Sequence, residues 1–452
     1  MIADLKPYAE YKESGLPWLG QVPGHWDTRP AFGAFVPNHE RNQGMKEKTV
    51  LSLSYGRIVI KPAEKLHGLV PESFETYQIV NPGDIVLRTT DLQNDHTSLR
   101  VGMVRNRGII TSAYLALRVN VGVSPDFGFQ CLNVWDTSKA IYGYGSGLRQ
   151  NLDFSHFKRM PVALPPPDEQ AAIVRFLDWA NGRLERAIRA KRKVIALLNE
   201  QKQAIIHRAV TRGLDPSVPL KPSGIPWLGD IPQHWALTRI KNVFHCFNTR
   251  RVPLNSVERG AMTSREYDYY GASGVIDKVD DYIFDDELLL IAEDGANLVL
   301  RNLPLAIIAK GKYWVNNHAH ILKPKRGSIA YLAHILETLN YAPWVSGAAQ
   351  PKLTKDRLLA ISIAIAPPVE QETIICYISE ETRPLITAIS RLEREIDLLR
   401  EYRTRLVADV VTGKLDVREA AARLPDEAAP EIAEDETSLG DEIEATEEEA
   451  VV

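Results

Sequence analysis

The sequence contains two copies of one long pattern, and this repetition constrains the possible folds more than any other feature. Residues 14–26 read SGLPWLGQVPGHW and residues 223–235 read SGIPWLGDIPQHW, with nine of thirteen positions identical. A second pair, PPPDEQAAIVRFLD (165–178) and APPVEQETIICYIS (366–379), follows each copy. The chain is therefore expected to be built from one unit used twice, a globular domain followed by a helix.

The segments after each PP–x–EQ sequence have the period of a long helix. Apolar residues recur there in steps of three, four and seven, which places them on one helical stripe. In the two copies they are Leu184, Ile188, Ile195, Leu198 and Ile205, and Leu385, Ile389, Ile396, Leu399 and Leu406. Two such heptad seams in one chain predict an antiparallel coiled coil, with an ordinary core helix pair as the alternative. Asn181–Gly182 and Pro384 predict a break or kink before each long helix. We place the long helices at 182–211 and 384–412, after shorter helices at 168–180 and 369–382.

The rest of each copy is rich in short apolar runs bounded by turn residues, which is typical of strands. The clearest candidates are Arg57–Lys61, Ile85–Thr90, Ile109–Val119, Tyr282–Phe284, Leu288–Ile291, Leu305–Ala309 and His320–Leu322. The predicted fold class is therefore α+β: two β-rich domains separated by two long antiparallel coiled-coil helices, in a pseudo-twofold repeat. The expected boundaries are 1–165 for the first domain, 166–213 for its helical spacer, 214–366 for the second domain, 367–418 for its spacer, and 419–452 for a disordered acidic tail.

Charge is distributed unevenly along the chain. Residues 424–452 hold twelve acidic residues and no Lys or Arg, so the tail is expected to be disordered. Residues 1–423 carry 54 basic and 46 acidic residues, a net charge of +8, which suits a polyanionic partner. The three cysteines are far apart in sequence and no apolar run reaches 18 residues, so we expect reduced thiols, no membrane span and a cytoplasmic location.

Polar, glycine-containing segments lie between the predicted strands. Arg, Asn, Gln and Ser side chains can read base edges, whereas Lys and Thr suit phosphates, so these segments are candidate DNA-binding loops. The candidates in the first domain are Arg57, Arg88, Thr89, Gln93, Arg105, Arg149 and Gln150. Those in the second domain are Arg250, Tyr270, Ser273, Lys312, Asn317, Gln350 and Lys352.

Catalytic motifs are missing from the sequence. There is no GxxxxGK[ST] loop, no glycine-rich cofactor fingerprint and no Asn-Pro-Pro-aromatic methyltransferase sequence. His318 and His320 are two residues apart in a predicted strand, so one should face inward, as a hydrogen-bonded core histidine more readily than as half of a metal site. The sequence therefore predicts a chain without catalytic residues, bound metal or bound cofactor.

The doubled SG[LI]PWLG–x–[VI]P–x–HW sequence, the PP–x–EQ helix starts and the closing T–x–x–LD resemble the specificity subunits of type I restriction–modification enzymes. YYGASG (269–274), EDGAN (293–297) and VNNHAH (315–320) resemble a target-recognition domain of that family. The resemblance covers residues 11–418 and implies two target-recognition domains, each reading half of an interrupted, asymmetric double-stranded DNA site. It also implies two modification subunits that use S-adenosylmethionine to methylate adenine, and restriction subunits that use ATP and Mg²⁺ to translocate and cut DNA.

Two other functions are compatible with the same residues. The chain could serve another partner, such as a methyltransferase fused to a nuclease. It could also be a coiled-coil scaffold that binds proteins and not DNA, although the basic body and the polar loops count against this. A steep dependence of DNA binding on salt would distinguish a DNA-binding chain from a scaffold.

Overall fold

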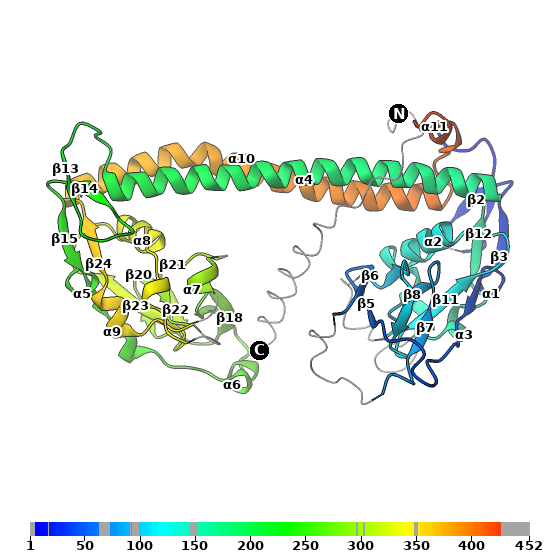
Figure 1. Ribbon diagram of the computed structural model, residues 1–452, viewed down its shortest axis with the longest axis horizontal. Helices are drawn as coiled ribbons and strands as arrows, with labels where there is room; N and C mark the ends of the chain where they lie inside the picture. The colour runs from blue at the N-terminus through cyan, green and yellow to red at the C-terminus, as the bar shows by residue number, and fades with distance from the viewer. Residues whose placement is uncertain are drawn as a thin grey trace. The chain divides into compact units, whose positions relative to one another are not determined.

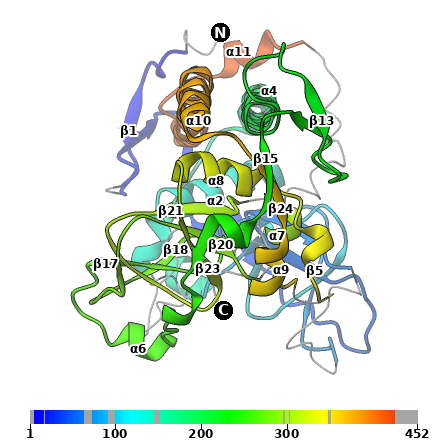
Figure 2. The same ribbon diagram turned by 90° about the vertical axis from the view of Figure 1, so that its left-hand side faces the viewer.

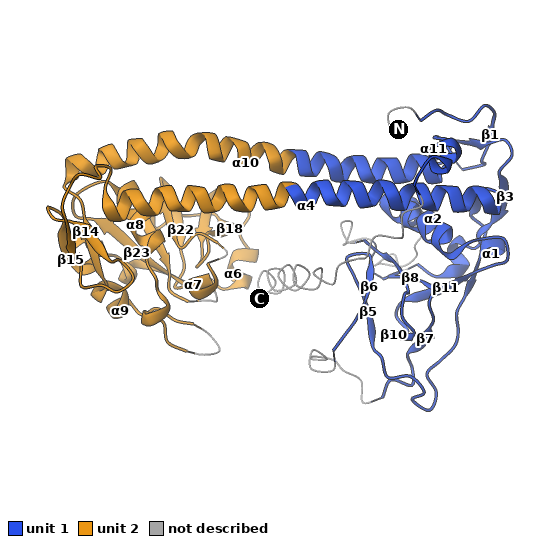
Figure 3. Ribbon diagram, turned by 45° about the horizontal axis from the view of Figure 1, so that its top comes forward, with its two compact units in different colours: residues 1–190, 395–452 blue, residues 191–394 orange. Residues whose placement is uncertain are grey.

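The structure, a computed structural model, divides the chain into two compact units, residues 1–190 with 395–452 and residues 191–394 (Figure 3). The residues it describes are 5–16, 18–62, 73–90, 92, 99–144, 152–294, 297–301, 303–347 and 351–425. Both units combine strands with helices, which confirms the predicted α+β class. In the described residues, no helix is long and apolar enough to span a membrane.

Short antiparallel strand pairs and one four-stranded sheet make up the first unit (Figure 1). Its strands are β1 (Tyr11–Glu13), β2 (Gln21–Pro23), β3 (Asp27–Pro30), β4 (Phe35–Pro37), β5 (Leu51–Ser54), β6 (Arg57–Ile60), β7 (Gln78–Val80), β8 (Ile85–Leu87), β9 (Val101–Met103), β10 (Gly108–Ile110), β11 (Leu115–Val119) and β12 (Pro161–Leu164). Its short helices are α1 (Ala31–Ala34), α2 (Pro125–Thr137), η3 (Ala140–Tyr144), α3 (Phe154–Phe157) and α11 (Arg418–Ala422). The four-stranded sheet has the order β4-β11-β8-β9, and β1–β2, β3–β12, β5–β6 and β7–β10 form pairs.

The second unit repeats most of this arrangement. Its strands are β13 (Leu220–Pro222), β14 (Asp230–Pro232), β15 (Ala236–Arg239), β16 (Phe244–Cys246), β17 (Tyr267–Tyr270), β18 (Val275–Val279), β19 (Phe284–Asp285), β20 (Leu288–Ala292), β21 (Ala306–Ala309), β22 (Lys312–Val315), β23 (Ala319–Pro324) and β24 (Ser362–Ile365). Its short helices are α5 (Ile240–Val243), η4 (Asn248–Arg250), α6 (Ser256–Gly260), α7 (Asn297–Leu300), α8 (Ile329–Thr338), η5 (Ala342–Trp344) and α9 (Lys355–Ala360). The sheet β16-β23-β20-β21 matches β4-β11-β8-β9, and the pairs β13–β14 and β15–β24 match β1–β2 and β3–β12.

The sheets β4-β11-β8-β9 and β16-β23-β20-β21 are each covered on both faces, which explains why strands β8 and β20 are apolar at every position. Successive side chains of a strand point to opposite faces. In the second unit, Leu289 and Ile291 share a core with α8, whereas Leu288 and Leu290 share a different core with Tyr313 of β22. Figure 2 shows α8 lying over one face of this sheet. In the first unit α2 covers the corresponding face.

The second covering layer differs between the units. In the first unit it consists of the pairs β5–β6 and β7–β10, whose residues share a core with Val86 of β8 and Ala116 of β11. In the second unit it is the sheet β18-β17-β22-β19, in which β17 and β22 are parallel. The predicted single strand Ile109–Val119 is wrong, because β10 pairs with β7 whereas β11 belongs to the four-stranded sheet, so a turn must separate them.

The two long helices are α4 (Pro167–Arg212) and α10 (Pro368–Val411). In the first unit, Arg403 lies 3.2 Å from Glu185, and Leu406 and Val410 share a core with Phe176. In the second unit, Ile206 and Val210 near the end of α4 share a core with Ile374 and Ile378 near the start of α10. The helices are therefore antiparallel within each unit, as predicted.

The ten ladder positions named in the sequence are buried or half-buried, which agrees with a heptad seam. The predicted breaks are wrong, since α4 and α10 are each one continuous helix. Gly182 costs only about 1 kcal/mol relative to alanine in a helix, and Leu184 and Ile188 beside it are buried. Pro384 is exposed, while Ile378 and Ile389 on the same helix stay buried, so packing of the apolar face keeps α10 continuous.

The first unit is closed by both terminal parts of the described chain. The amide of Asp416 donates to the carbonyl of Lys6 at 2.8 Å. The Arg418 guanidinium lies over the Tyr8 ring, 5.2 Å from its centroid. Ala421 and Leu424 are buried, so the first residues of the predicted tail are packed here, and residues 426–452 lie outside the described residues.

Candidate nucleic-acid interface

A buried carboxylate anchors the framework of the first unit. Glu169, in the first turn of α4, accepts from Trp26 Nε1 at 2.9 Å and from the Tyr8 hydroxyl at 2.6 Å. Its other oxygen lies 2.7 Å from Nε2 of His25. Its side chain is only 3% exposed, so three donors satisfy a carboxylate that would otherwise be costly to bury. Burial and Glu169 raise the pKa of Tyr8, which keeps its hydroxyl a donor.

The second unit repeats this junction with fewer donors. Glu370 accepts from Trp235 Nε1 at 3.1 Å, and its Oε2 lies 2.7 Å from Nε2 of His234. The Glu370 side chain is 28% exposed. These contacts explain why the HW and EQ sequences are repeated together: each Trp and His is bound by the Glu that opens the next long helix.

The glutamine beside each glutamate fixes the helix that covers the sheet. Gln170 accepts from the amide of Ser124 at 2.8 Å, and Ser124 caps α2. Gln371 accepts from the amide of Ser328 at 2.9 Å, immediately before α8. The EQ dipeptide therefore connects the long helices to the strand framework and to the sheet cover of each unit.

Each unit presents an equivalent edge of its four-stranded sheet, which we call the loop edge. In the first unit it lies where β8 ends and β11 begins, and in the second where β20 ends and β23 begins. The amide of Leu152 donates to the carbonyl of Thr89 at 2.8 Å, and that of Leu353 donates to the carbonyl of Glu293 at 2.7 Å. Thr89 and Glu293 therefore occupy the same place in the two units.

In the second unit the loop edge holds a compact cluster of charges. Glu293 forms an ion pair with Arg251 and lies 3.4 Å from Nζ of Lys352. Burial alone would raise the pKa of Glu293, but the hydrogen bond from Arg251 and the surrounding positive charge lower it overall. The carboxylate is therefore ionised at neutral pH.

His318, directly before β23, and His320, within β23, face opposite ways, as the alternation of side chains along a strand predicted. His320 is fully buried, its Nε2 donates to the carbonyl of Leu353 at 2.7 Å, and its Nδ1 accepts from Asn248 at 2.8 Å. Burial lowers the pKa of His320 and favours this neutral form. His318 is 47% exposed, and its Nδ1 lies 2.9 Å from Asp294.

The predicted DNA contacts of the second domain fall in two places. Asn317 and Lys352 lie at the loop edge, and β17 places Tyr270 beside Asn316, with Ser273 in the exposed turn that follows. Arg250 and Lys312 lie apart from them on aromatic rings: Arg250 is 4.7 Å from the Phe284 centroid, and Lys312 Nζ is 4.6 Å from that of Tyr282. Gln350 lies outside the described residues.

The predicted contacts of the first domain are more dispersed. Arg88 and Thr89 lie at the loop edge, where Thr89 is buried. Arg57 opens β6, and Arg105 is exposed and forms an ion pair with Asp126 at 3.2 Å. Gln93, Arg149 and Gln150 lie outside the described residues. All the predicted contacts therefore remain predictions.

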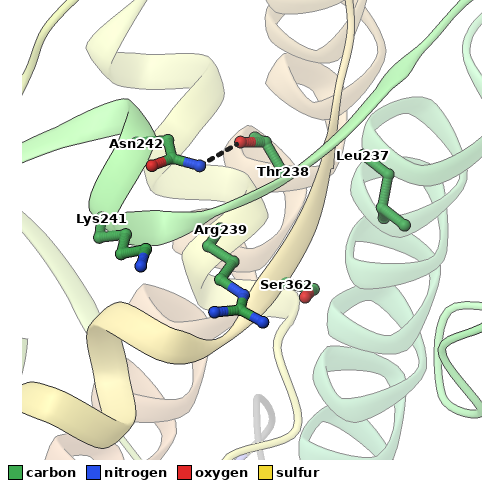
Figure 4. A pocket seen from close by; sticks show the side chains of 6 residues that line it. All are labelled: Leu237, Thr238, Arg239, Lys241, Asn242 and Ser362. Carbon is green, nitrogen blue, oxygen red and sulfur yellow. Dashed lines mark hydrogen bonds between the residues drawn. The ribbon is translucent and has the colours of Figure 1, made fainter.

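The supporting role of several residues at the two sites was missed in the sequence. Arg100 is fully buried and donates to the carbonyl of Thr90 at 2.7 Å, so it supports the first loop edge. Arg251 and Glu293 have the same supporting role in the second. The available signal was a charged residue directly after an apolar strand, as at Glu293. Figure 4 shows a further basic hollow, lined by Leu237, Thr238, Arg239, Lys241, Asn242 and Ser362.

Part of the chain matches a known protein family. Residues 232–397 match the family model described as the type I restriction modification DNA specificity domain. The resemblance to type I specificity subunits is confirmed. A Haemophilus influenzae protein named as a type I restriction enzyme specificity subunit is 36% identical over 141 residues, 31% of this chain and 35% of that protein. The chain thus matches about a third of that relative's length.

A solved structure of a type I restriction–modification system supports the same fold. It is described as the structural basis underlying complex assembly and conformational transition of the type I R-M system. The match has a TM-score of 0.57 at 14% identity, and it covers 87% of this chain and 99% of that one. At this identity the match shows a shared α+β fold, and what the chain binds is a separate question.

Proposed function

We propose that this chain is the sequence-specific DNA-recognition subunit of a type I restriction–modification complex. Its two domains read the two halves of an asymmetric, interrupted site, and partner subunits methylate adenine and cut DNA. The observation that carries the proposal is the match of residues 232–397 to a DNA specificity domain, in a chain whose first unit repeats the same framework and sheet.

The loop edges are the proposed DNA-reading surfaces. In both units they combine segments from separate parts of the chain at one sheet edge, and both include residues predicted as contacts, such as Arg88 in the first unit and Asn317 and Lys352 in the second. Asn can bind base edges, while Lys and Arg bind both bases and phosphates. A base-reading side chain replaced by alanine should lose about 1–3 kcal/mol of discrimination.

The catalytic steps are assigned to partners in this proposal. Two modification subunits would supply S-adenosylmethionine and the methyltransferase site, and restriction subunits would supply ATP, Mg²⁺ and the nuclease. The chain itself would bind double-stranded DNA without a cofactor. Incubating the purified chain with DNA and S-adenosylmethionine should therefore give no methyl transfer, and transfer would overturn this division of labour.

The test is the adenine methylation pattern of the host genome with and without the gene. Deleting the gene should remove one bipartite methylation motif, and restoring it on a plasmid should return the same motif. An unchanged pattern after deletion would reject the proposal. Binding of the purified chain to random duplex should also weaken steeply as salt rises, which a protein-binding scaffold would not show.

A further inference from the structure

Glu293 places a negative charge at a surface that is proposed to approach DNA phosphates. Its side chain is 13% exposed, and it directly follows β20. A carboxylate there opposes DNA binding unless its charge is used to orient cations. The structurally equivalent residue of the first unit is Thr89, which carries no charge.

Arg251 uses its donors within the protein. Its Nη1 binds Glu293 and also donates to the carbonyls of Asn317 and Ala319, both at 3.0 Å. Its Nε donates to the carbonyl of Asn248 at 3.0 Å. The Arg251 side chain is 16% exposed. Glu293 and Arg251 therefore join the segment after β16 to the segment that carries Asn317 and His318.

Lys352, unlike Arg251, exposes much of its side chain to solvent. Its side chain is 52% exposed while its Nζ stays 3.4 Å from Glu293. Its backbone is fixed by bridges to Asp294 and Ser346. A lysine side chain normally moves freely about its four-carbon stem, so the carboxylate narrows the positions that the ammonium group occupies.

We propose that Glu293 is a positioning residue for recognition of the second half-site. It holds the Lys352 ammonium directly, and through Arg251 it holds the segment bearing Asn317 and His318, in the orientation that contacts DNA. This inference rests on the proposed DNA-reading function. The first half-site is read without such a carboxylate, because Thr89 stands in its place.

The experiment compares Glu293→Gln with Glu287→Gln in the assembled complex. Glu287 is a matched control, since it flanks the other end of β20 and pairs with Lys310 at 2.6 Å. The readouts are the methylation motif on a randomised DNA library, the affinity for random duplex and the thermal midpoint. Glu293→Gln should lower preference at one or more positions of the second half-site by about tenfold or more, with the first half-site unchanged. Glu287→Gln should leave both halves intact.

Affinity for random duplex separates positioning from simple repulsion. If Glu293 acts only by its negative charge, Glu293→Gln should bind all DNA more tightly with its motif unchanged, which would overturn the proposal. Lys352→Gln is the second variant, because it removes an exposed group without burying anything. It should relax a position that Glu293→Gln also relaxes, and an unaffected motif would likewise overturn the proposal. A wild-type complex that yields no motif would instead reject the proposed function.

Discussion

The two units share a framework and differ in what they place on it. In both, the Glu of the EQ dipeptide binds the Trp and His of the HW dipeptide, and the neighbouring Gln fixes the helix over the sheet. The second covering layer and the loop edges differ, with Thr89 in one unit where Glu293 stands in the other. The comparison teaches that the repeated sequence maintains the junction, whereas the unrepeated sequence can vary between the units, as the proposed reading of two different half-sites requires.

The largest expected effect is a complete change of one half-site. The Ala31 amide donates to the Met160 carbonyl, and the Ile240 amide donates to the Ile361 carbonyl. Residues 31–160 and 240–361 therefore begin and end at equivalent backbone contacts, and neither range includes the Trp, His and Glu of its junction. Replacing 240–361 by a second copy of 31–160 should convert the asymmetric motif into one made of two copies of the first half-site. The measurement is methylation of a randomised library by the variant complex.

The exchange would contradict this division of roles if the repeated framework also contributes to sequence specificity. The second half of the motif would then keep part of its original sequence although its own loops are gone. The reverse exchange, with 240–361 in place of 31–160, serves as the matched control and should double the second half-site.

The next largest effect concerns the junction tryptophans. Trp26 and Trp235 are buried, so replacing either by alanine should cost about 3–5 kcal/mol of stability. Hydrogen exchange should show the loss mainly in the unit that carries the substitution. Equal loss of protection in both units would mean that they unfold together and are not separate cooperative units.

A smaller effect should distinguish the two glutamates. Glu169 has three donors and is 3% exposed, whereas Glu370 has two donor residues and is 28% exposed. Glu169→Gln removes the carboxylate charge and puts an NH₂ donor in place of one acceptor oxygen, so it should cost about 1–3 kcal/mol, more than Glu370→Gln. The free energies of unfolding from denaturant titrations test this order, and a larger cost for Glu370→Gln would contradict it.

The smallest effect is a pH dependence contributed by two histidines of the second unit. Burial lowers the pKa of both His320 and His334. The unfolded chain then binds more protons than the folded one below about pH 6.5, so acid favours unfolding. Their stabilising contribution is present above that pH and is lost as pH falls. Protection factors for hydrogen exchange in the second unit, which remove the intrinsic pH dependence of exchange, should be larger at pH 7.5 than at pH 5.5, and His334→Gln should reduce that difference.

Repetition and periodicity predicted the units, the long helices and some of the strands, because these depend on local patterns. The helix breaks at Gly182 and Pro384 were mispredicted, since long-range packing outweighs local propensity there. The split of Ile109–Val119 depends on which sheet each half joins, and no local pattern records that.

The site was harder to predict than the fold. Asn317 and Lys352 were singled out by residue type, and the structure brings them to one edge. The supporting roles of Arg251 and Arg100 were missed, because they come from contacts with carbonyls that lie 68 and 10 residues away in the sequence. The partner of an arginine cannot be read from its neighbours, whereas the period of a helix can.

The first unit needs both ends of the described chain, and this affects the order in which the two units can finish folding. The second unit is one continuous stretch, residues 191–394, but the first unit also needs residues from 395 onward. A ribosome therefore releases the second unit in full before the last pieces of the first. Domains commonly fold as they emerge during synthesis, so here the part translated first must wait for Leu406, Val410 and Leu424 to complete its core. A nascent chain that stops early would carry a finished second half and an unfinished first.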